Sequence, residues 1–155
     1  MKLSNLIKMA AVAAALTLGG SPLAGSESRS DWKAHWITPS LSQSATNTWI
    51  SYRKEFKVSE CPDRLVARIS ADSKYWMWIN GELAVFEGGL KRGPFPNGTY
   101  YDKVDIAPFL KEGDNTIAIL LWHFGKQGFS HNSSGQAALI FEAVSPGLEI
   151  LSDQS

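Results

Sequence analysis

A β-hairpin at residues 72–86 constrains the fold of this chain more than any other feature. Its centre is Asn80-Gly81, between two runs rich in aromatic and β-branched residues. This dipeptide supplies the two positive-φ residues of a type I′ turn. If Ile79 faces Glu82 across the turn, the register of both strands follows. The sequence therefore predicts an antiparallel strand pair.

Both faces of this hairpin are apolar. Tyr75, Met77 and Ile79 point to one side, and Trp76 and Trp78 point to the other. A strand of a free-standing antiparallel sandwich usually buries one face and exposes the other to water. We therefore assign the first three residues to the core and the two tryptophans to a face that contacts a partner. The register predicts the pairs Trp78–Leu83, Met77–Ala84, Trp76–Val85, Tyr75–Phe86 and Lys74–Glu87.

The rest of the chain also alternates with the period of β-strands. Turn residues separate these runs at regular intervals, and only a single helical turn, at 107–110, interrupts them. This pattern predicts an all-β fold, an antiparallel β-sandwich of jelly-roll type with about eight strands. The further strands are expected at 35–38, 49–58, 65–71, 99–106, 116–124 and 136–144, with another beginning at 148.

The first 25 residues have the order of a secretory signal peptide. Lys2 and Lys8 precede an apolar stretch at 9–18, and small residues follow. The stretch is too short to span a bilayer as a helix. We expect a signal peptide at 1–25, a tether at 26–31, export to a bacterial periplasm or medium, and no membrane anchor after cleavage.

The remaining residues, 32–155, are enough for one domain with a modest core. A last strand pattern begins at Leu148 and leaves little room for a partner strand before Ser155. We therefore expect a β-sandwich domain that is truncated at its C-terminal end, or that is the front piece of a longer protein.

Charge and cysteine content narrow the possible partners. Two of the 15 basic residues lie in the predicted signal peptide, which leaves 13 against 15 acidic residues. This balance argues against nucleic acid as a partner. Cys61 is the only cysteine, so no intrachain disulfide can form.

The acidic and histidine residues do not form a recognisable catalytic set. Hydrolysis of a glycosidic bond usually needs two carboxylates that converge on one sugar ring. Asp102 and Asp105 are three residues apart in a predicted strand, which places them on opposite faces. His123 and His131 lack a cysteine pair, an HExxH motif or a third ligand. We therefore predict no catalytic residue, metal or cofactor in this chain.

The loop at 125–135 is the most site-like segment. It combines hydrogen-bonding groups for sugar hydroxyls with an aromatic ring for a sugar's C–H surface. A solvated loop also collects polar residues, so both interpretations stay open. The candidate carbohydrate- or domain-contacting residues are Trp76, Trp78, Trp122, Lys126, Gln127, Phe129, His131 and Asn132.

The N-terminal β-sandwich of bacterial α-L-rhamnosidases and related glycoside hydrolases is similar to three stretches of this chain. They are ISADSKYWMWINGE at 69–82, YYDKVDIAPFLKEGDNTIAILLWHFGKQGFSH at 100–131 and SGQAALIFEA at 134–143. The resemblance implies a galactose-binding-like sandwich ahead of an (α/α)6 catalytic barrel. It also implies that the catalytic glutamates belong to that barrel, since no position here corresponds to them.

Three hypotheses follow for the function. In the first, which we favour, the chain is a non-catalytic N-terminal accessory domain of an exported α-L-rhamnosidase-like glycoside hydrolase, and its partner is a missing C-terminal catalytic domain. In the second, it is a self-sufficient secreted carbohydrate-binding module whose partner is a glycan. The third, a small exported hydrolase, has the least support because no catalytic pair is recognisable.

Overall fold

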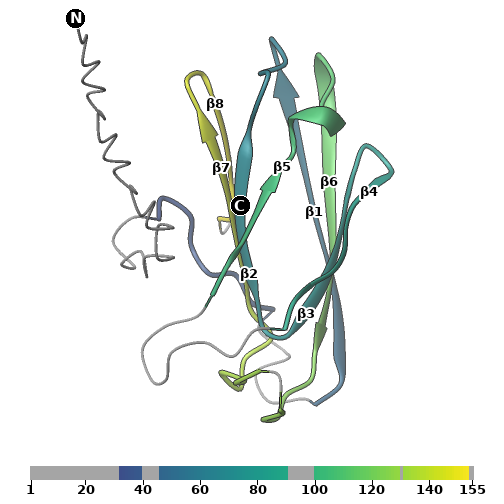
Figure 1. Cartoon of the computed structure of the whole chain (residues 1–155), viewed down its shortest axis with the longest axis vertical. Helices are drawn as coiled ribbons and strands as arrows, with labels where there is room; N and C mark the ends of the chain where they lie inside the picture. Colours follow the sequence, from purple (N-terminus) through teal and green to yellow (C-terminus); the bar gives the residue numbers. More distant parts are fainter. Residues whose placement is uncertain (1–31, 40–45, 91–99, 130, 154–155) are drawn as a thin grey trace, which may run out of the picture.

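The structure is a computed structural model that describes residues 32–39, 46–90, 100–129 and 131–153. These residues form two antiparallel sheets of four strands each, which face one another (Figure 1). The predicted all-β sandwich is confirmed. The predicted signal peptide and tether lie outside the described residues. Within the described part of the chain, no helix is long and apolar enough to cross a membrane.

One sheet has the strand order β1-β6-β3-β4 and the other has the order β5-β2-β7-β8. The segment expected as a strand at 35–38 forms only a single bridge, from Ile37 to Leu139. The elements are β1 Thr48–Val58, β2 Val66–Ala71, β3 Lys74–Ile79, β4 Glu82–Gly89, β5 Asp102–Asp105, the 3₁₀ helix η2 Ala107–Phe109, β6 Gly113–His123, β7 Leu139–Ser145 and β8 Leu148–Leu151.

The core lies between the two sheets and follows from the alternation of each strand. Tyr75, Met77 and Ile79 of β3 are fully buried, as predicted, while Trp76 and Trp78 lie on the outer side and are half-buried. β6 buries every second residue in the same way and β2 nearly so, whereas the first five residues of β7 are all buried. The inner residues include Ala67 and Ile69 of β2, Ile117 and Ile119 of β6, and Leu139, Phe141 and Ala143 of β7.

The β3–β4 hairpin keeps the predicted register only next to its turn. Beyond the first two pairs, irregularities shift the pairing, so that Tyr75 lies opposite Gly88 instead of Phe86. A Cβ atom on residue 88 would lie 2.3 Å from Cζ of Tyr75. The buried tyrosine ring therefore needs glycine opposite it, which local alternation does not predict. The predicted pairs Tyr75–Phe86, Trp76–Val85, Met77–Ala84 and Lys74–Glu87 are not directly opposite one another.

The last strand has a partner, contrary to the expectation from the sequence. β8 forms a hairpin with β7, and Ser145 lies opposite Leu148. Gly147 has a φ of 77°, so the chain reverses at once after β7. Ile150 of β8 is then buried in the core. The prediction that this strand has no partner is wrong, because the turn between Ser145 and Leu148 is short enough for β8 to pair with β7.

Residues 32–34 cover the outer face of the β5-β2-β7-β8 sheet. Arg68 of β2 donates to Glu142 of β7 at 2.5 Å, and its guanidinium lies 4.4 Å from the ring centre of Trp32. The other oxygen of Glu142 accepts the backbone N–H groups of Lys33 and Ala34. Burial acts to raise the pKa of Glu142, but the hydrogen bonds from Arg68, Ala34 and Lys33 bring it below its ordinary value.

Candidate functional site

The outer side of the β1-β6-β3-β4 sheet carries a continuous apolar surface, here called the aromatic face. Its residues alternate along each strand with those of the core, so the same period that builds the core also builds this face. Cross-strand pairing brings them together, with Trp49 opposite Trp122 and Trp78 opposite Leu83. The aromatic face consists of Trp49, Trp76, Trp78, Leu83, Ala118, Leu120 and Trp122.

Three indole rings stack on one another in this face. The ring of Trp49 lies 4.7 Å from that of Trp122, with 10° between the planes. It lies 5.6 Å from the ring of Trp76, with 24° between the planes. Stacked aromatic pairs add stability beyond the area they bury. The rings are therefore held in place before any partner arrives.

Several polar groups around the aromatic face are already paired within the domain. The indole N–H of Trp122 donates to Asn47 at 2.8 Å. The ammonium of Lys74 forms an ion pair of 2.9 Å with Glu87 and lies 5.8 Å from the ring centre of Trp76. These groups do not need a ligand to satisfy them, so the face offers a partner mainly apolar area.

The rim of this surface stays in contact with water. Trp49 is 49% exposed and Leu83 is 45% exposed, while Phe86, also from edge strand β4, is 70% exposed. Large apolar side chains that cluster at the surface mark interaction sites more often than single ones do. The predicted double-sided hairpin is thus part of a wider surface that extends from β4 to Trp49 near one end of β1.

The predicted loop at 125–135 continues from this face but is only partly exposed. Phe124 packs edge-on against Trp122, and His131 packs edge-on against Phe124 with ring centres 5.0 Å apart. His131 is 5% exposed, so its role is one of packing within the loop. Phe129, in contrast, is fully exposed.

The other predicted loop residues have mixed positions. Gln127 braces the loop, because its side-chain amide donates to the carbonyl of Ser133 and accepts the backbone N–H of the same residue. Lys126 is exposed and Asn132 is half-buried. The structure therefore places Trp76, Trp78 and Trp122 on one surface, and it exposes three of the predicted loop residues, Lys126, Gln127 and Phe129.

A carboxylate that the sequence did not single out anchors this loop. Asp72, between β2 and β3, accepts hydrogen bonds from the hydroxyls of Ser73, Ser133 and Ser134 and from the backbone N–H of Ser134. The buried ring of His123 lies 3.3 Å from the same carboxylate. These contacts tie the loop to the end of the aromatic face.

The acidic pair considered for catalysis has two separate structural roles. Asp102 accepts the hydroxyl of buried Tyr75 at 2.9 Å, and this contact links the two sheets. Asp105 accepts the backbone N–H groups of Leu65 and Ala107. The two carboxylates do not converge. Among the described residues, no group of three or more His, Cys, Asp or Glu side chains is arranged to hold a metal ion.

Sequence reasoning missed Trp49 as a member of the candidate surface. Its position in the alternation of β1 pointed outward, together with Ser51 and Arg53. The missing information was the neighbour, since β1 pairs with β6, which lies more than 50 residues further along the chain. The one sequence signal that could have placed Trp49 on the candidate surface was a tryptophan at an outward position, among polar residues of the same strand.

Comparison with known proteins connects this sandwich to a group of enzymes. No family model matches the sequence, and no curated protein matches it either. Among solved structures, a GH78-family rhamnosidase from Bacillus sp. GL1 matches with a TM-score of 0.69 and 32% identity, over 79% of this chain and 13% of that chain. The chain resembles a domain of GH78 α-L-rhamnosidases.

More distant enzymes share the fold of this domain. The α-L-rhamnosidase from Aspergillus terreus matches with a TM-score of 0.59 and 22% identity, over 84% of this chain and 17% of that one. The Streptomyces avermitilis α-L-rhamnosidase, solved with L-rhamnose, matches with a TM-score of 0.54 and 18% identity, over 81% of this chain and 14% of that one. The resemblance expected from the sequence is confirmed, and it concerns a small part of each enzyme.

Proposed function

We propose that this chain is a non-catalytic accessory β-sandwich of an exported α-L-rhamnosidase-like glycoside hydrolase. The observation that carries the proposal is the match to the Bacillus enzyme, which takes in 79% of this chain but 13% of the enzyme. The separate structural roles of Asp102 and Asp105 agree with chemistry performed elsewhere.

The aromatic face is the surface that contacts the catalytic part of the protein in this proposal. Contact surfaces between proteins are rich in tryptophan at their centre and poor in charge. The centre of this face consists of Trp76, Trp78 and Trp122, and the charge of Lys74 is neutralised by Glu87. A sugar would need several unpaired donors and acceptors beside the rings. The composition of the face therefore favours a protein partner.

A carbohydrate-binding module that acts by itself is the second candidate. The half-exposed ring of Trp49 and the fully exposed ring of Phe129 favour it, because exposed aromatic rings pack against the C–H surface of sugars. In that case the partner is a glycan, and the exposed part of the 125–135 loop supplies the polar contacts.

Export belongs to the same proposal. It rests on the order of basic, apolar and small residues at 1–25. Expression of the full gene in a bacterium, followed by fractionation and N-terminal sequencing, tests it. We expect a mature protein in the periplasm or medium that begins near residue 25. A protein that keeps Met1 in the cytoplasm would contradict export.

The gene beyond the codon of Ser155 provides the first test of the accessory role. We expect a reading frame, continuous or frame-shifted, that encodes a helical catalytic barrel. Unrelated sequence after a stop codon would contradict the proposal. If the barrel is present, it can be produced separately and titrated with this chain by isothermal calorimetry.

A matched pair of variants then tests the surface. Leu83→Asp introduces a charge into the aromatic face at a position that is 45% exposed, and Val144→Asp does so on the opposite sheet at 37% exposure. We expect Leu83→Asp to weaken binding of the barrel at least about tenfold, because burying an unpaired charge is costly, while Val144→Asp binds like the parent. Equal loss in both variants would contradict docking through the aromatic face. Binding of a rhamnose-containing glycan by the isolated chain would favour the second candidate.

A further inference from the structure

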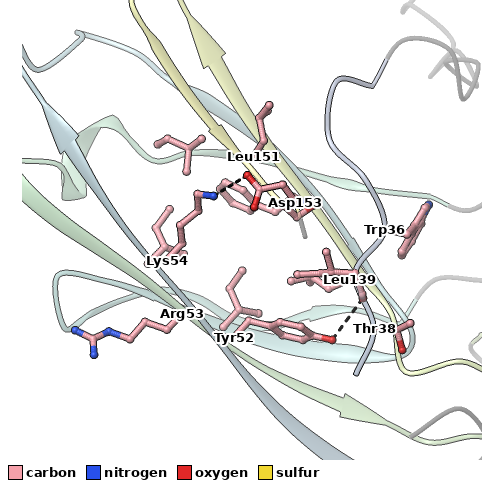
Figure 2. Close-up of a pocket in the computed structure, with 14 residues that line it drawn as sticks. Trp36, Thr38, Tyr52, Arg53, Lys54, Leu139, Leu151 and Asp153 are labelled. Carbon is pink, nitrogen blue, oxygen red and sulfur yellow. Dashed lines mark hydrogen bonds and ion pairs between the residues drawn. The ribbon is translucent and has the colours of Figure 1, made fainter. Parts of the chain in front are cut away.

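A concave site lies on the opposite side of the β1-β6-β3-β4 sheet from the aromatic face. It is a cleft of about 520 Å³ between the edge strand β1 and the β7–β8 hairpin, where the two sheets separate (Figure 2). Cavities that bind small molecules have volumes of roughly 300–1,000 Å³. The cleft is therefore large enough for a ligand of two or three fused or linked rings.

The unequal lengths of the two edge strands explain this cleft. β1 has 11 residues and β8 has four, so β8 covers only part of the sandwich edge that faces β1. Side chains of the hydrophobic core are left at the bottom of the gap. The floor consists of Ile117, Ile119, Leu139, Phe141 and Ile150.

The rim is held in place by hydrogen bonds. Ile37 and Leu139 exchange both backbone hydrogen bonds, at 2.8 and 3.0 Å. This bridge positions the neighbouring side chains of Trp36 and Thr38 at the mouth of the cleft (Figure 2). Trp36 is 38% exposed and provides a flat aromatic wall.

The charged groups at the rim are already neutralised. Lys54 and Asp153 form an ion pair of 2.9 Å across the mouth. The side chain of Arg53 points away from the cleft (Figure 2) and pairs with Glu55 at 2.7 Å. A charged ligand would have to displace one of these partners. The rim therefore favours a neutral ligand.

The hydroxyl of Tyr52 is the polar group best placed to recognise such a ligand. It donates to the carbonyl of Ile37 at 3.5 Å, a distance at which a hydrogen bond is weak. A tyrosine hydroxyl is protonated at neutral pH, and burial raises the pKa of Tyr52 further, to about 12. The hydroxyl can therefore exchange its long contact for a shorter one to a ligand.

We propose that this cleft binds a neutral, flat, amphipathic small molecule, an aromatic or alicyclic ring system that carries a hydroxyl, arylamine or carbonyl group. The ring system would lie on the floor and against Trp36, and its polar group would meet Tyr52 and Thr38. A monosaccharide does not fit this chemistry, because its hydroxyls would face the isoleucine, leucine and phenylalanine side chains without partners. The site is separate from the aromatic face and does not depend on the proposed function.

Titration of the full chain with N-phenyl-1-naphthylamine, a neutral probe that fluoresces in apolar surroundings, tests this proposal. The chain carries Leu83→Asp and Phe86→Ser in all measurements, so that binding to the aromatic face is reduced. We expect saturable binding of one probe per chain. Thr38→Trp fills the mouth from an exposed position and should weaken binding about tenfold or more. Tyr52→Phe should weaken it about threefold, the loss of one hydrogen bond.

A control variant separates the filling of the cleft from the mere addition of a tryptophan. Lys57→Trp adds a tryptophan at an exposed position of β1 that does not line the cleft, and it should leave binding unchanged. Circular dichroism and the unfolding midpoint of each variant establish that it is folded. The proposal is overturned if no saturable binding occurs or if Thr38→Trp binds like Lys57→Trp.

Discussion

The two sheets of this sandwich differ most in their outer faces. On the β5-β2-β7-β8 sheet, the ion pair of Arg68 and Glu142 lies beneath Trp32 and the backbone of the next two residues. On the β1-β6-β3-β4 sheet, Trp49 and Leu83 remain about half exposed. In the described part of the chain, no segment covers this second face as residues 32–34 cover the first.

The outer face of the β5-β2-β7-β8 sheet, called the closed face below, is covered by residues 32–34 of the same chain. The aromatic face, called the open face below, has no such cover among the described residues. A buried ion pair is stable only when its remaining hydrogen-bonding groups are satisfied, and the N-terminal segment does this for Glu142. An apolar face can stay open without leaving any polar group unsatisfied, but it loses the stabilisation that burial would bring. Covering the aromatic face with a partner would therefore stabilise the domain further, because more apolar surface would be buried.

The largest expected effect comes from the closed face. Glu142→Ala removes the carboxylate that the guanidinium of Arg68 binds, and it removes the acceptor of two backbone N–H groups. We expect a loss of about 3–5 kcal/mol in the free energy of unfolding, measured by urea denaturation. Glu55→Ala, which breaks an exposed pair with Arg53, is the control and should have no measurable effect. Similar losses in both variants would contradict the comparison.

A smaller loss is expected when the cover of the closed face is removed. Trp32→Ala deletes the ring that stacks on Arg68 and packs edge-on against Tyr101. These contacts should contribute about 1–2 kcal/mol, and residues 32–34 should become more sensitive to proteolysis. Trp36→Ala lies in the same segment and should not change the protection of the Glu142 site. Unchanged proteolysis of Trp32→Ala would show that the backbone hydrogen bonds alone hold the segment.

Acid provides a test that distinguishes the two faces without changing their shape. The pKa of Glu142 is below its ordinary value in the folded protein, so its contribution to stability is complete above about pH 4.5 and is lost as the pH falls through the folded-state pKa. The difference in unfolding midpoint between the parent and Glu142→Gln should shrink from pH 6 to pH 3. A difference that stays constant with pH would exclude this carboxylate as the cause.

The smallest effect on stability is expected on the open face. Phe86→Ser changes a side chain that is 70% exposed, so the free energy of unfolding should change by about 0.5 kcal/mol or less. Self-association of the isolated chain, measured by analytical ultracentrifugation, should decrease because less apolar surface is exposed. Val144→Ser on the other sheet should not alter association. A parent chain that stays monomeric at high concentration would contradict the claim that the aromatic face promotes association.

The sequence alone predicted the architecture through properties that are local. Alternation identified the strands, the Asn80-Gly81 turn located the hairpin, and the same alternation separated Tyr75 and Met77 from Trp76. It also predicted that the face carrying Trp76 would be apolar. Each of these conclusions depends only on residues a few positions apart, because the side-chain period of a strand is two.

Which residues pair between strands of the same sheet was decided only by the tertiary structure. The shifted register of the hairpin comes from the fit of Gly88 against the Tyr75 ring, and the hairpin of β7 and β8 comes from the turn at Gly147. Likewise, only the pairing of β1 with β6 places Trp49 against Trp122.

In this protein the sequence determined which side chains point outward, whereas the tertiary structure determined which of them are neighbours and which are covered. The physical reason is that outward direction follows from backbone geometry within one strand. Neighbours and cover depend instead on contacts between segments far apart in the chain, such as Trp32 over Arg68 and the cleft beside β8.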